Sequence, residues 1–389
     1  MLSDLPLLFK NSVRNKRRTI LTTLSVAASL CLLALMMALY HNFYLVEASP
    51  EQARRLVVRN RVSLMNPLPL SYERRISQAP GVKEAVIFQW FGGTYKDARD
   101  PANFFGRFGV EPEKLAVVYP EYKLPDAERA AFIAERASCV VGRKTANRHN
   151  LQVGDRITIV GDIFPVTLNL VVRGIYDANR DNENLIFHWE YLNQSLQAAA
   201  RGRMNQVGCF VVLMERPQDA AAMSKGIDDL FRNSPVQTKT ETERAFEISF
   251  MAFVGNVKLF LMAIGAAVTF TILLVAGNSM AMSVRERIHE IGVLKTIGYT
   301  PGRVLSLLLG EALLIAMAGG VLGVALAEIL CSVLRSAPSM FADMSRLGVH
   351  PPVVAASLLA AAVIGLASSL LPALSAARRP IVEALRVSD

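Results

Sequence analysis

Four long segments with few or no charged residues restrict the chain to folds that hold several apolar helices. Residues 19–40 and 259–284 contain no charged side chain, and 304–334 contains only Glu311 and Glu328. The fourth segment, 347–377, includes Pro351, which suits the first turn of a helix. About 20 apolar residues in a helix span a hydrocarbon core of about 30 Å. The sequence therefore predicts four transmembrane helices, at 19–41, 253–284, 300–335 and 351–377.

The first segment could also be a cleaved signal peptide, because basic residues precede it. Signal peptides have an apolar stretch of about 7–15 residues and small residues at the cleavage site. Here the apolar stretch is longer, and it is followed by Tyr40-His41-Asn42-Phe43. We interpret 19–41 as a retained anchor.

The distribution of charge predicts the orientation in the membrane. Basic residues gather before the first helix, within 285–303 and after 377. Cytoplasmic loops carry an excess of Lys and Arg, so we place these three regions, including both termini, in the cytoplasm. The segment 42–252 is then external, with 27 Lys and Arg against 25 Asp and Glu. The net charge of +9 is therefore an orientation signal rather than a nucleic-acid surface.

The expected organisation follows from these assignments. Hydrophobic residues make up 52% of the 389 residues and mean hydropathy is +0.32, which suits membrane helices joined to one polar domain. We expect, in order, a cytoplasmic N-terminal helix at 1–18, a transmembrane helix at 19–41, an external α+β domain at 42–252, a transmembrane helix at 253–284, a cytoplasmic helix at 285–299, a transmembrane helix at 300–335, a short external loop at 336–350, a transmembrane helix at 351–377 and a cytoplasmic tail at 378–389.

The external domain shows alternating apolar residues typical of strands at 82–88, 157–159, 166–172 and 208–213, and helical spacing at 127–137 and 217–233. It has no HExxH, CxxC or GxSxG motif, and the histidines are scattered without metal-ligand spacing. The stretch VVGRKTANRH lacks the glycine pattern of a phosphate loop, so we interpret it as a strand that runs into a helix. The sequence predicts no catalytic residues and no metal site.

Two of the four cysteines, Cys139 and Cys209, fall in strand-like runs of the external domain. In an oxidising compartment they could form a disulfide. Two buried free thiols are the alternative, and the sequence does not decide between them.

The charged insert between the second and third apolar segments has the pattern of a short amphipathic helix. Ile288, Ile291, Leu294 and Ile297 follow the spacing of one apolar stripe, with charged residues beside them. Gly298 suits the C-terminal end of this helix, and Thr300-Pro301 suits the start of the next. A passive linker lying at the membrane surface would have the same pattern.

The insert VRERIHEIGVLKTIGYTPGRV resembles the cytoplasmic segment of MacB/FtsX-type ABC permeases. Other stretches resemble further parts of that family, in order along nearly the whole chain. They are LFKNSVRNKRRTILTTLSVAAS, APGVKEAV, VVGRKTANRHNLQVGDRITI, VVRGIYD, GEALLIAMAGGVLG and ARRPIVEALR. The chain departs from the family at His289, where Arg or Lys is common, and at Ile381, where proline is usual.

The resemblance implies a permease in the bacterial inner membrane that pairs with a second permease subunit and with a separate ABC ATPase. ATP and Mg would be bound by that ATPase, with no cofactor in this chain. A periplasmic adaptor and an outer-membrane protein are further partners of some members. The residues expected to contact the ATPase are Arg285, Glu286, Arg287, Glu290, Ile291, Leu294, Lys295, Ile297 and Gly298. Ile291, Leu294 and Ile297 would fill a groove of the ATPase. The contacts at the rim of the groove would be Arg285, Glu286, Arg287 and Glu290.

Small residues recur at four-residue spacing in the third and fourth apolar segments. They are Ala316, Gly319, Gly320, Gly323, Ala361 and Gly365. Such residues let helix backbones approach closely, either within the chain or between two subunits. Glu311 is an acid inside the third apolar segment, and we expect it to pair with a polar group of another helix.

The resemblance implies that the chain couples ATP hydrolysis in a partner to movement of the external domain, for export or extraction of a substrate. The main alternative is a signalling scaffold of FtsX type, which would regulate an external enzyme such as a cell-wall hydrolase without moving cargo. A membrane-anchored binding protein that has no ATPase is disfavoured by the charged insert.

Overall fold

The computed structural model describes residues 16–45, 49–178, 182–199, 204–254, 257–336 and 347–386. The chain divides into two compact units, a helical unit of residues 1–46, 255–337 and 344–389 and an α/β unit of residues 47–254 and 338–343. Most of the predicted N-terminal helix at 1–18 and most of the predicted loop at 336–350 lie outside the described residues.

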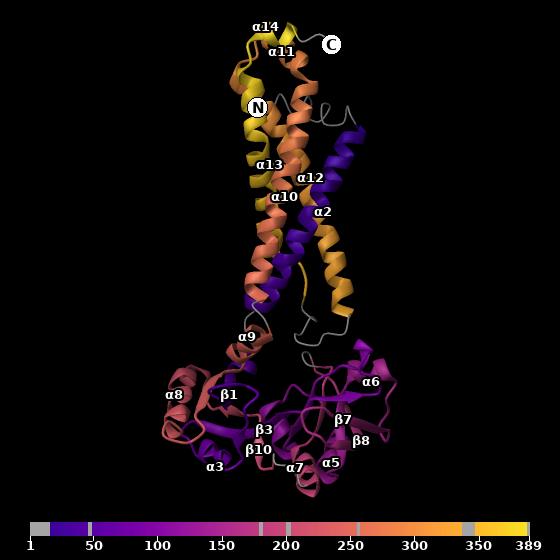
Figure 1. Ribbon diagram of the computed structural model, residues 1–389, viewed down its shortest axis with the longest axis vertical. Helices are drawn as coiled ribbons and strands as arrows, with labels where there is room; N and C mark the ends of the chain where they lie inside the picture. The colour runs from indigo at the N-terminus through magenta and orange to yellow at the C-terminus, as the bar shows by residue number, and fades with distance from the viewer. Residues whose placement is uncertain are drawn as a thin grey trace. The chain divides into compact units, whose positions relative to one another are not determined.

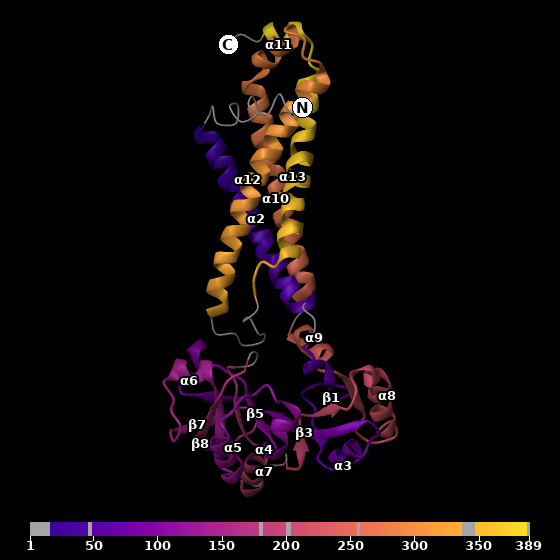
Figure 2. The ribbon, with the colours of Figure 1, turned by 180° about the vertical axis from the view of Figure 1, so that it is seen from behind.

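The helical unit contains four long helices, drawn in Figures 1 and 2. All four are long and apolar enough to cross a membrane. Two short helices lie together at one end of this unit in both views. The helices are α2 Lys16–Tyr40, α10 Val257–Glu286, α11 Ile288–Thr296, α12 Pro301–Ser336, α13 Pro351–Arg378 and α14 Ile381–Arg386, and a π-helical turn, His41–Leu45, extends α2.

Glycines of α12 allow its close contact with α2. A Cβ atom on Gly323 would lie 2.8 Å from the carbonyl oxygen of Ala27. One on Gly319 would lie 2.7 Å from Cγ1 of Val26. These distances are shorter than carbon contacts allow, so any larger residue would push the two helices apart.

The second set of small residues lies between α12 and α13. A Cβ atom on Gly365 would lie 2.5 Å from the Cβ of Ala316, and one on Gly320 would lie 3.0 Å from the Cβ of Ala361. Of the two uses that the sequence allowed for these residues, the structure places them in packing within the chain.

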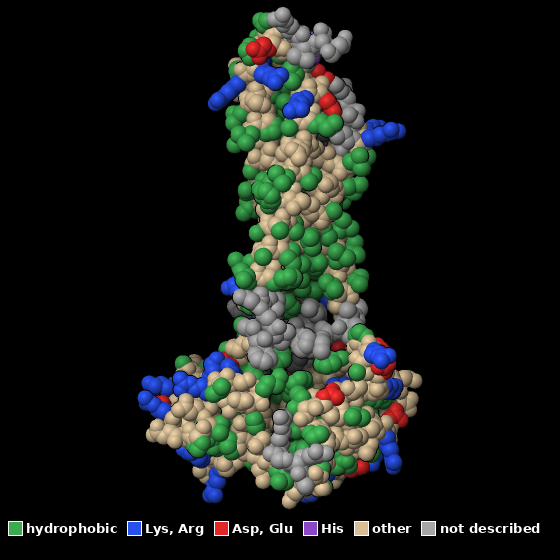
Figure 3. Space-filling view, in the orientation of Figure 1, with side chains coloured by type: hydrophobic (Ala, Val, Ile, Leu, Met, Phe, Trp, Pro, Cys, Tyr) green, Lys and Arg blue, Asp and Glu red, His purple; other side chains and the backbone are tan. Residues whose placement is uncertain are grey.

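Figure 3 shows how side chains are distributed over one face of the helical unit. Hydrophobic side chains cover its middle, and Lys, Arg, Asp and Glu gather near the end that carries α11 and α14. This distribution suits a bundle whose middle faces lipid.

The α/β unit is built on a ten-stranded mixed sheet with the order β12-β1-β11-β3-β5-β9-β6-β8-β7-β4. The pairs β5–β9 and β6–β8 are parallel, and the other neighbours are antiparallel. A separate pair joins β10 to β2. The strands are β1 Arg55–Asn60, β2 Leu68–Pro69, β3 Val82–Trp90, β4 Gly93–Tyr95, β5 Arg107–Val110, β6 Ser138–Gly142, β7 Arg156–Gly161, β8 Thr167–Tyr176, β9 Leu185–His188, β10 Gln206–Val207, β11 Cys209–Met214 and β12 Thr238–Thr242.

Helices cover both faces of this sheet. Every residue of β1 is buried, as expected for a strand covered on both sides, whereas β7 alternates between exposed and buried residues. One apolar core includes residues of α3, α7 and α8, a second of α6 and α7, and a third of α4 and α5. The helices are α3 Tyr72–Ser77, α4 Pro112–Val118, α5 Asp126–Ala134, α6 Arg143–His149, α7 Trp189–Ala198, α8 Ala220–Leu230 and α9 Glu243–Val254, with short 3-10 turns at Gln52–Arg54, Pro101–Asn103 and Pro217–Asp219.

The strands and helices predicted for the external domain are present, with ends that differ by a few residues. The predicted strands correspond to β3, β7, β8 and β11, and the predicted helices to α5 and to α8 with the turn before it. The stretch VVGRKTANRH is the strand β6 followed by α6, as predicted.

The disulfide between Cys139 and Cys209 is not supported by the structure. Both thiols are free. Cys139 lies on β6 and Cys209 on β11, with β3, β5 and β9 between them. Strands in a sheet are about 4.8 Å apart, so four such steps place the two residues about 19 Å apart, far beyond disulfide reach. Burial raises the pKa of Cys209 to about 12, which keeps its thiol protonated at neutral pH.

Arg107, at the start of β5, is an unusual buried charge. Its side chain is only 2% exposed, and its Nε has no hydrogen-bond partner among the described residues. One Nη donates to the carbonyl oxygen of Asn103 at 3.0 Å, and the guanidinium lies 4.4 Å from the ring centroid of Phe105. Burial lowers the pKa of Arg107 to about 10.

We expect Arg107→Met to raise the free energy of unfolding of the α/β unit by about 1–3 kcal/mol. It removes a buried charge that makes no salt bridge within the described residues and is offset only by the longer-range attraction of Asp162. The two tryptophans of the chain, Trp90 and Trp189, both lie in this unit, so their fluorescence during denaturation measures the change. A loss of stability would mean that the guanidinium makes contacts worth more than its burial costs.

Candidate functional site

The charged insert forms the short helix α11, which the local sequence separates from its neighbours. Helix α10 ends at Glu286, and Arg287 leaves the helical conformation with φ −112° and ψ 11°. At the other end Gly298 has a φ of +102°, which a residue with a side chain adopts at a cost. The amide of Tyr299 donates to the carbonyl of Leu294 at 3.0 Å, and that of Gly298 to Lys295 at 3.2 Å, as in a Schellman cap.

One face of α11 is buried against the helical unit. Ile291 is 5% exposed and belongs to an apolar cluster formed with residues of α10, α12 and α13. The other buried members of the cluster are Met280, Val284, Val304, Leu308, Ala373, Ala376 and Ala377. Ile291 was predicted to fill a groove of a partner. This prediction is wrong for the structure observed, because the side chain is already packed within the chain.

Arg287 lies at the break between α10 and α11 and joins this region to α12. Its Nη1 donates to Oε2 of Glu311 at 2.6 Å, and its Nε donates to Oε2 of Glu290 at 3.1 Å. The side chain of Glu311 is 4% exposed and that of Arg287 is 12% exposed. Arg287 was predicted as a rim contact for a partner, but it faces inward because the buried carboxylate of Glu311 needs a cation. Glu311 is thus paired with a group outside its own helix.

Lys295 provides a second connection on the inner side. Its Nζ donates to the carbonyl oxygen of Arg379, which follows α13, at 2.6 Å. Helix α14 also contacts α11, and both lie at the same end of the helical unit in Figures 1 and 2. Helix α11 is therefore held by contacts with α10, α12, α13 and α14.

The outer face of α11 remains exposed. We use the name outer face of α11 for His289 and Val293 of this helix, Ile297 at its C-terminal end, and Arg285 and Glu286 at the end of α10; all five side chains are exposed. Val293 is 40% exposed and Ile297 is 72% exposed. His289 and Val293 were not among the predicted contact residues. Their spacing to Ile297, four residues at each step, is the signal that identifies this face.

The remaining predicted contact residues lie between these two faces. Leu294 and Glu290 are half-buried, and Gly298 ends the helix. The outer face therefore combines an apolar pair with charged and imidazole groups on a helix that is fixed from behind. Within the described residues, no group of three or more His, Cys, Asp or Glu is placed to hold a metal ion.

A second buried cluster of charges, in the α/β unit, lies where the chain enters and leaves that unit. Arg55, the first residue of β1, is 4% exposed and donates from Nε to Glu243 at 2.7 Å and from Nη2 to Glu121 at 2.7 Å. The guanidinium also lies 4.3 Å from the ring centroid of Tyr119. Burial raises the pKa of the Tyr119 hydroxyl, with a further contribution from Glu243.

Comparison with known proteins gives two matches to family models. A MacB-like periplasmic core domain matches residues 19–230, and an FtsX-like permease C-terminal domain matches residues 261–381. An uncharacterised ABC transporter permease of Methanocaldococcus jannaschii is 23% identical over 97% of this chain and 96% of its own length.

Two further proteins show partial similarity. The macrolide export ATP-binding/permease protein MacB of Chromobacterium violaceum is 36% identical over 28% of this chain and 16% of its own length. The solved periplasmic region of MacB from Actinobacillus actinomycetemcomitans aligns at 12% identity, with a TM-score of 0.37, over 50% of this chain and 92% of that one.

Proposed function

This chain belongs to the family of FtsX-like ABC transporter permeases with a MacB-like periplasmic core domain, and on that basis we propose that it couples ATP hydrolysis in a separate ATPase to movement of its α/β unit. The observation that carries the proposal is the two-sided character of α11. Val293 and Ile297 are exposed on one side, while Ile291 and Arg287 fix the other side to the helical unit.

A helix with one exposed face and one face packed against its own chain can transmit force. An amphipathic helix docks into a groove of its partner through apolar side chains spaced one turn apart, and the outer face of α11 has this spacing. Displacement of α11 by the ATPase would act on α10, α12 and α13 together, because α11 contacts all three. The salt bridge from Arg287 to Glu311 keeps α11 from moving without α12.

The ATPase would supply the binding of ATP and Mg, and a second permease subunit would complete the transporter. The name of the MacB relative includes ATP binding, and this chain aligns with only 16% of that protein. We place ATP binding in a partner chain because no stretch of this sequence has the glycine pattern of a phosphate loop. The work done would be export or extraction of a substrate at the external side, with a periplasmic adaptor and an outer-membrane protein as further partners.

Affinity purification of the chain from its native membrane, followed by identification of the associated chains, tests this function. We expect an ABC ATPase in near-stoichiometric amount. Recovery of a cell-wall hydrolase, without adaptor or cargo, would replace transport with the scaffold function. Purification with no ATPase would contradict the proposal.

The orientation follows from the basic residues near α11 and the C-terminus, which suit the cytoplasmic side of a bacterial inner membrane. We expect an impermeant thiol reagent to label Val62→Cys in spheroplasts, because this residue is 83% exposed in the external α/β unit. Thr296→Cys, exposed on α11, should react only after lysis. Labelling of Thr296→Cys from outside would reverse the proposed orientation.

A further inference from the structure

The α/β unit contains a hollow between the end of α4, the segment 120–125, the start of α5 and the end of β8. Its volume is about 660 Å³, which lies within the range of small-molecule sites. Apolar side chains, among them Ala116, Leu124 and Ile175, line part of its wall, and basic side chains line another part. The basic residues are Lys123, Arg129 and Arg143.

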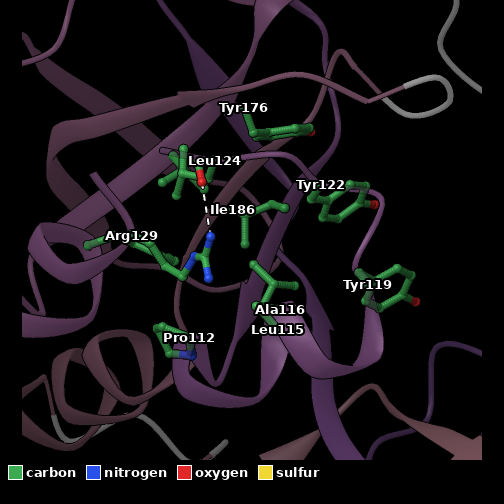
Figure 4. Close-up of a pocket in the computed structure, with 11 residues that line it drawn as sticks. Pro112, Leu115, Ala116, Tyr119, Tyr122, Leu124, Arg129, Tyr176 and Ile186 are labelled. Carbon is green, nitrogen blue, oxygen red and sulfur yellow. Dashed lines mark hydrogen bonds between the residues drawn. The ribbon is translucent and has the colours of Figure 1, made fainter. Parts of the chain in front are cut away.

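A smaller cavity of about 20 Å³ adjoins this hollow and shares Ala116, Tyr122, Leu124 and Arg129 with it. Figure 4 shows that the guanidinium of Arg129 and the rings of Tyr122 and Tyr119 lie on opposite sides of this cavity. Tyr122 and Leu124 therefore contribute both to the wall of the hollow and to the apolar interior behind it.

The aromatic part of this wall is fixed in place. The ring centroids of Tyr119 and Tyr122 are 5.2 Å apart with planes at 7°, and those of Tyr122 and Tyr176 are 4.9 Å apart. The backbones of Lys123 and Asp177 exchange two hydrogen bonds, at 2.9 and 3.0 Å. A wall held in this way is formed before any ligand arrives. Binding therefore loses little conformational entropy by ordering these side chains.

The three basic groups differ in how far they are already neutralised. Arg143 pairs with Asp177 at 3.0 Å and lowers the pKa of that carboxyl. Arg129 pairs with Asp126 at 2.9 Å and donates to the carbonyl oxygen of Leu124 at 3.1 Å. Lys123 is exposed, and no carboxylate of the described residues lies within salt-bridge distance of its ammonium. It is the cation available to a ligand.

We propose that the hollow binds a small molecule with a ring-containing apolar body and one anionic group. The ring would lie against Tyr122 and Leu124, since aromatic rings pack favourably on tyrosine faces. The anionic group would face Lys123, with Arg129 close by. This proposal concerns the α/β unit alone and does not depend on the ATPase assigned to α11.

Photolabelling of the full chain in lipid nanodiscs tests the proposal with two matched probes, the anion 4-azidobenzoate and the neutral 4-azidobenzamide. After irradiation and trypsin digestion, the peptides 115–123 and 124–129 should carry the label. An exposed ion pair is worth up to about 1 kcal/mol, so the anionic probe should label these peptides up to about fivefold more than the neutral one.

Two variants locate the label. Ala116→Phe fills the hollow and should lower labelling by both probes to the level of other external peptides, whereas Ala130→Phe, exposed elsewhere on α5, should leave it unchanged. Lys123→Gln should bring the ratio of labelling by the anionic probe to labelling by the neutral probe to about one. This variant loses the trypsin site at residue 123, so its label is measured on the single peptide 115–129.

Tryptophan fluorescence checks that each variant is folded. If Ala116→Phe does not fold, the probe ratio of folded Lys123→Gln tests the proposal instead. Label spread evenly over the external peptides would overturn the proposal. So would an unchanged probe ratio in folded Lys123→Gln.

Discussion

Arg287→Leu is expected to lower the free energy of unfolding of the helical unit by about 3–5 kcal/mol, because it leaves Glu311 buried without its cation. The carboxylate of Glu311 accepts a 2.6 Å hydrogen bond from Arg287 and is almost inaccessible to solvent. Without its cation, the Glu311 carboxylate either stays charged in a site that water does not solvate or takes up a proton. Either state costs free energy relative to the ion pair. Unfolding by SDS, followed by circular dichroism in mixed micelles, measures the effect.

The double variant Arg287→Leu/Glu311→Leu separates this cause from a general packing defect. When both charges are replaced by apolar groups of similar size, no uncompensated charge remains, and most of the lost stability should return. Arg285→Leu is the matched control, since Arg285 is exposed two residues away and should change the free energy by less than about 0.5 kcal/mol. A double variant as unstable as the single one would show that the pair does not act through charge.

Arg55→Leu is the second substitution with a large expected effect, in the α/β unit. It removes the cation shared by Glu121 and Glu243 and the partner of the Tyr119 ring. We expect a loss of about 3–5 kcal/mol, measured by tryptophan fluorescence during denaturation. The same change should expose the start of α9 to protease, since Glu243 begins that helix.

Arg136→Leu is the control for this experiment. Its salt bridge to Glu190 spans 3.4 Å, with side chains 59% and 50% exposed, so the loss should not exceed about 1 kcal/mol. Equal losses in the free energy of unfolding for Arg55→Leu and Arg136→Leu would show that the buried cluster around Arg55 contributes no more than a surface salt bridge.

The arrangement of the helices could be predicted because it depends on local composition. A run of apolar residues long enough to cross a bilayer appears directly in the sequence, and so do the residues that end α11 and begin α12. The predicted apolar stripe of α11 is right only in part, because Ile291 is buried whereas Ile297 is exposed on the outer face, and the predicted partner of Ile291 is wrong. A stripe shows that a face will be buried without showing against what, and Ile291 packs on the helices of its own chain.

Features that depend on long-range contacts could not be predicted. The break at Arg287 turns its side chain toward Glu311, 24 positions later in the chain, and only the packed structure reveals that pairing. The sequence could not exclude a disulfide between Cys139 and Cys209 for a similar reason. The distance between the two residues depends on the order of the strands in the sheet, which the sequence does not show. The outer residues His289 and Val293 were missed because exposure is known only after the inner face is fixed.

Ile297→Asp tests whether the outer face of α11 binds the ATPase. The side chain is 72% exposed, so the substitution should leave the fold intact, yet it places a carboxylate in an apolar contact if a partner covers this face. Val62→Asp is the control, because Val62 is an apolar residue of the α/β unit that is 83% exposed. We predict that Ile297→Asp lowers recovery of the ATPase with the purified permease by about tenfold or more, while Val62→Asp does not. Undiminished ATPase recovery with folded Ile297→Asp would show that the ATPase does not dock on the outer face of α11.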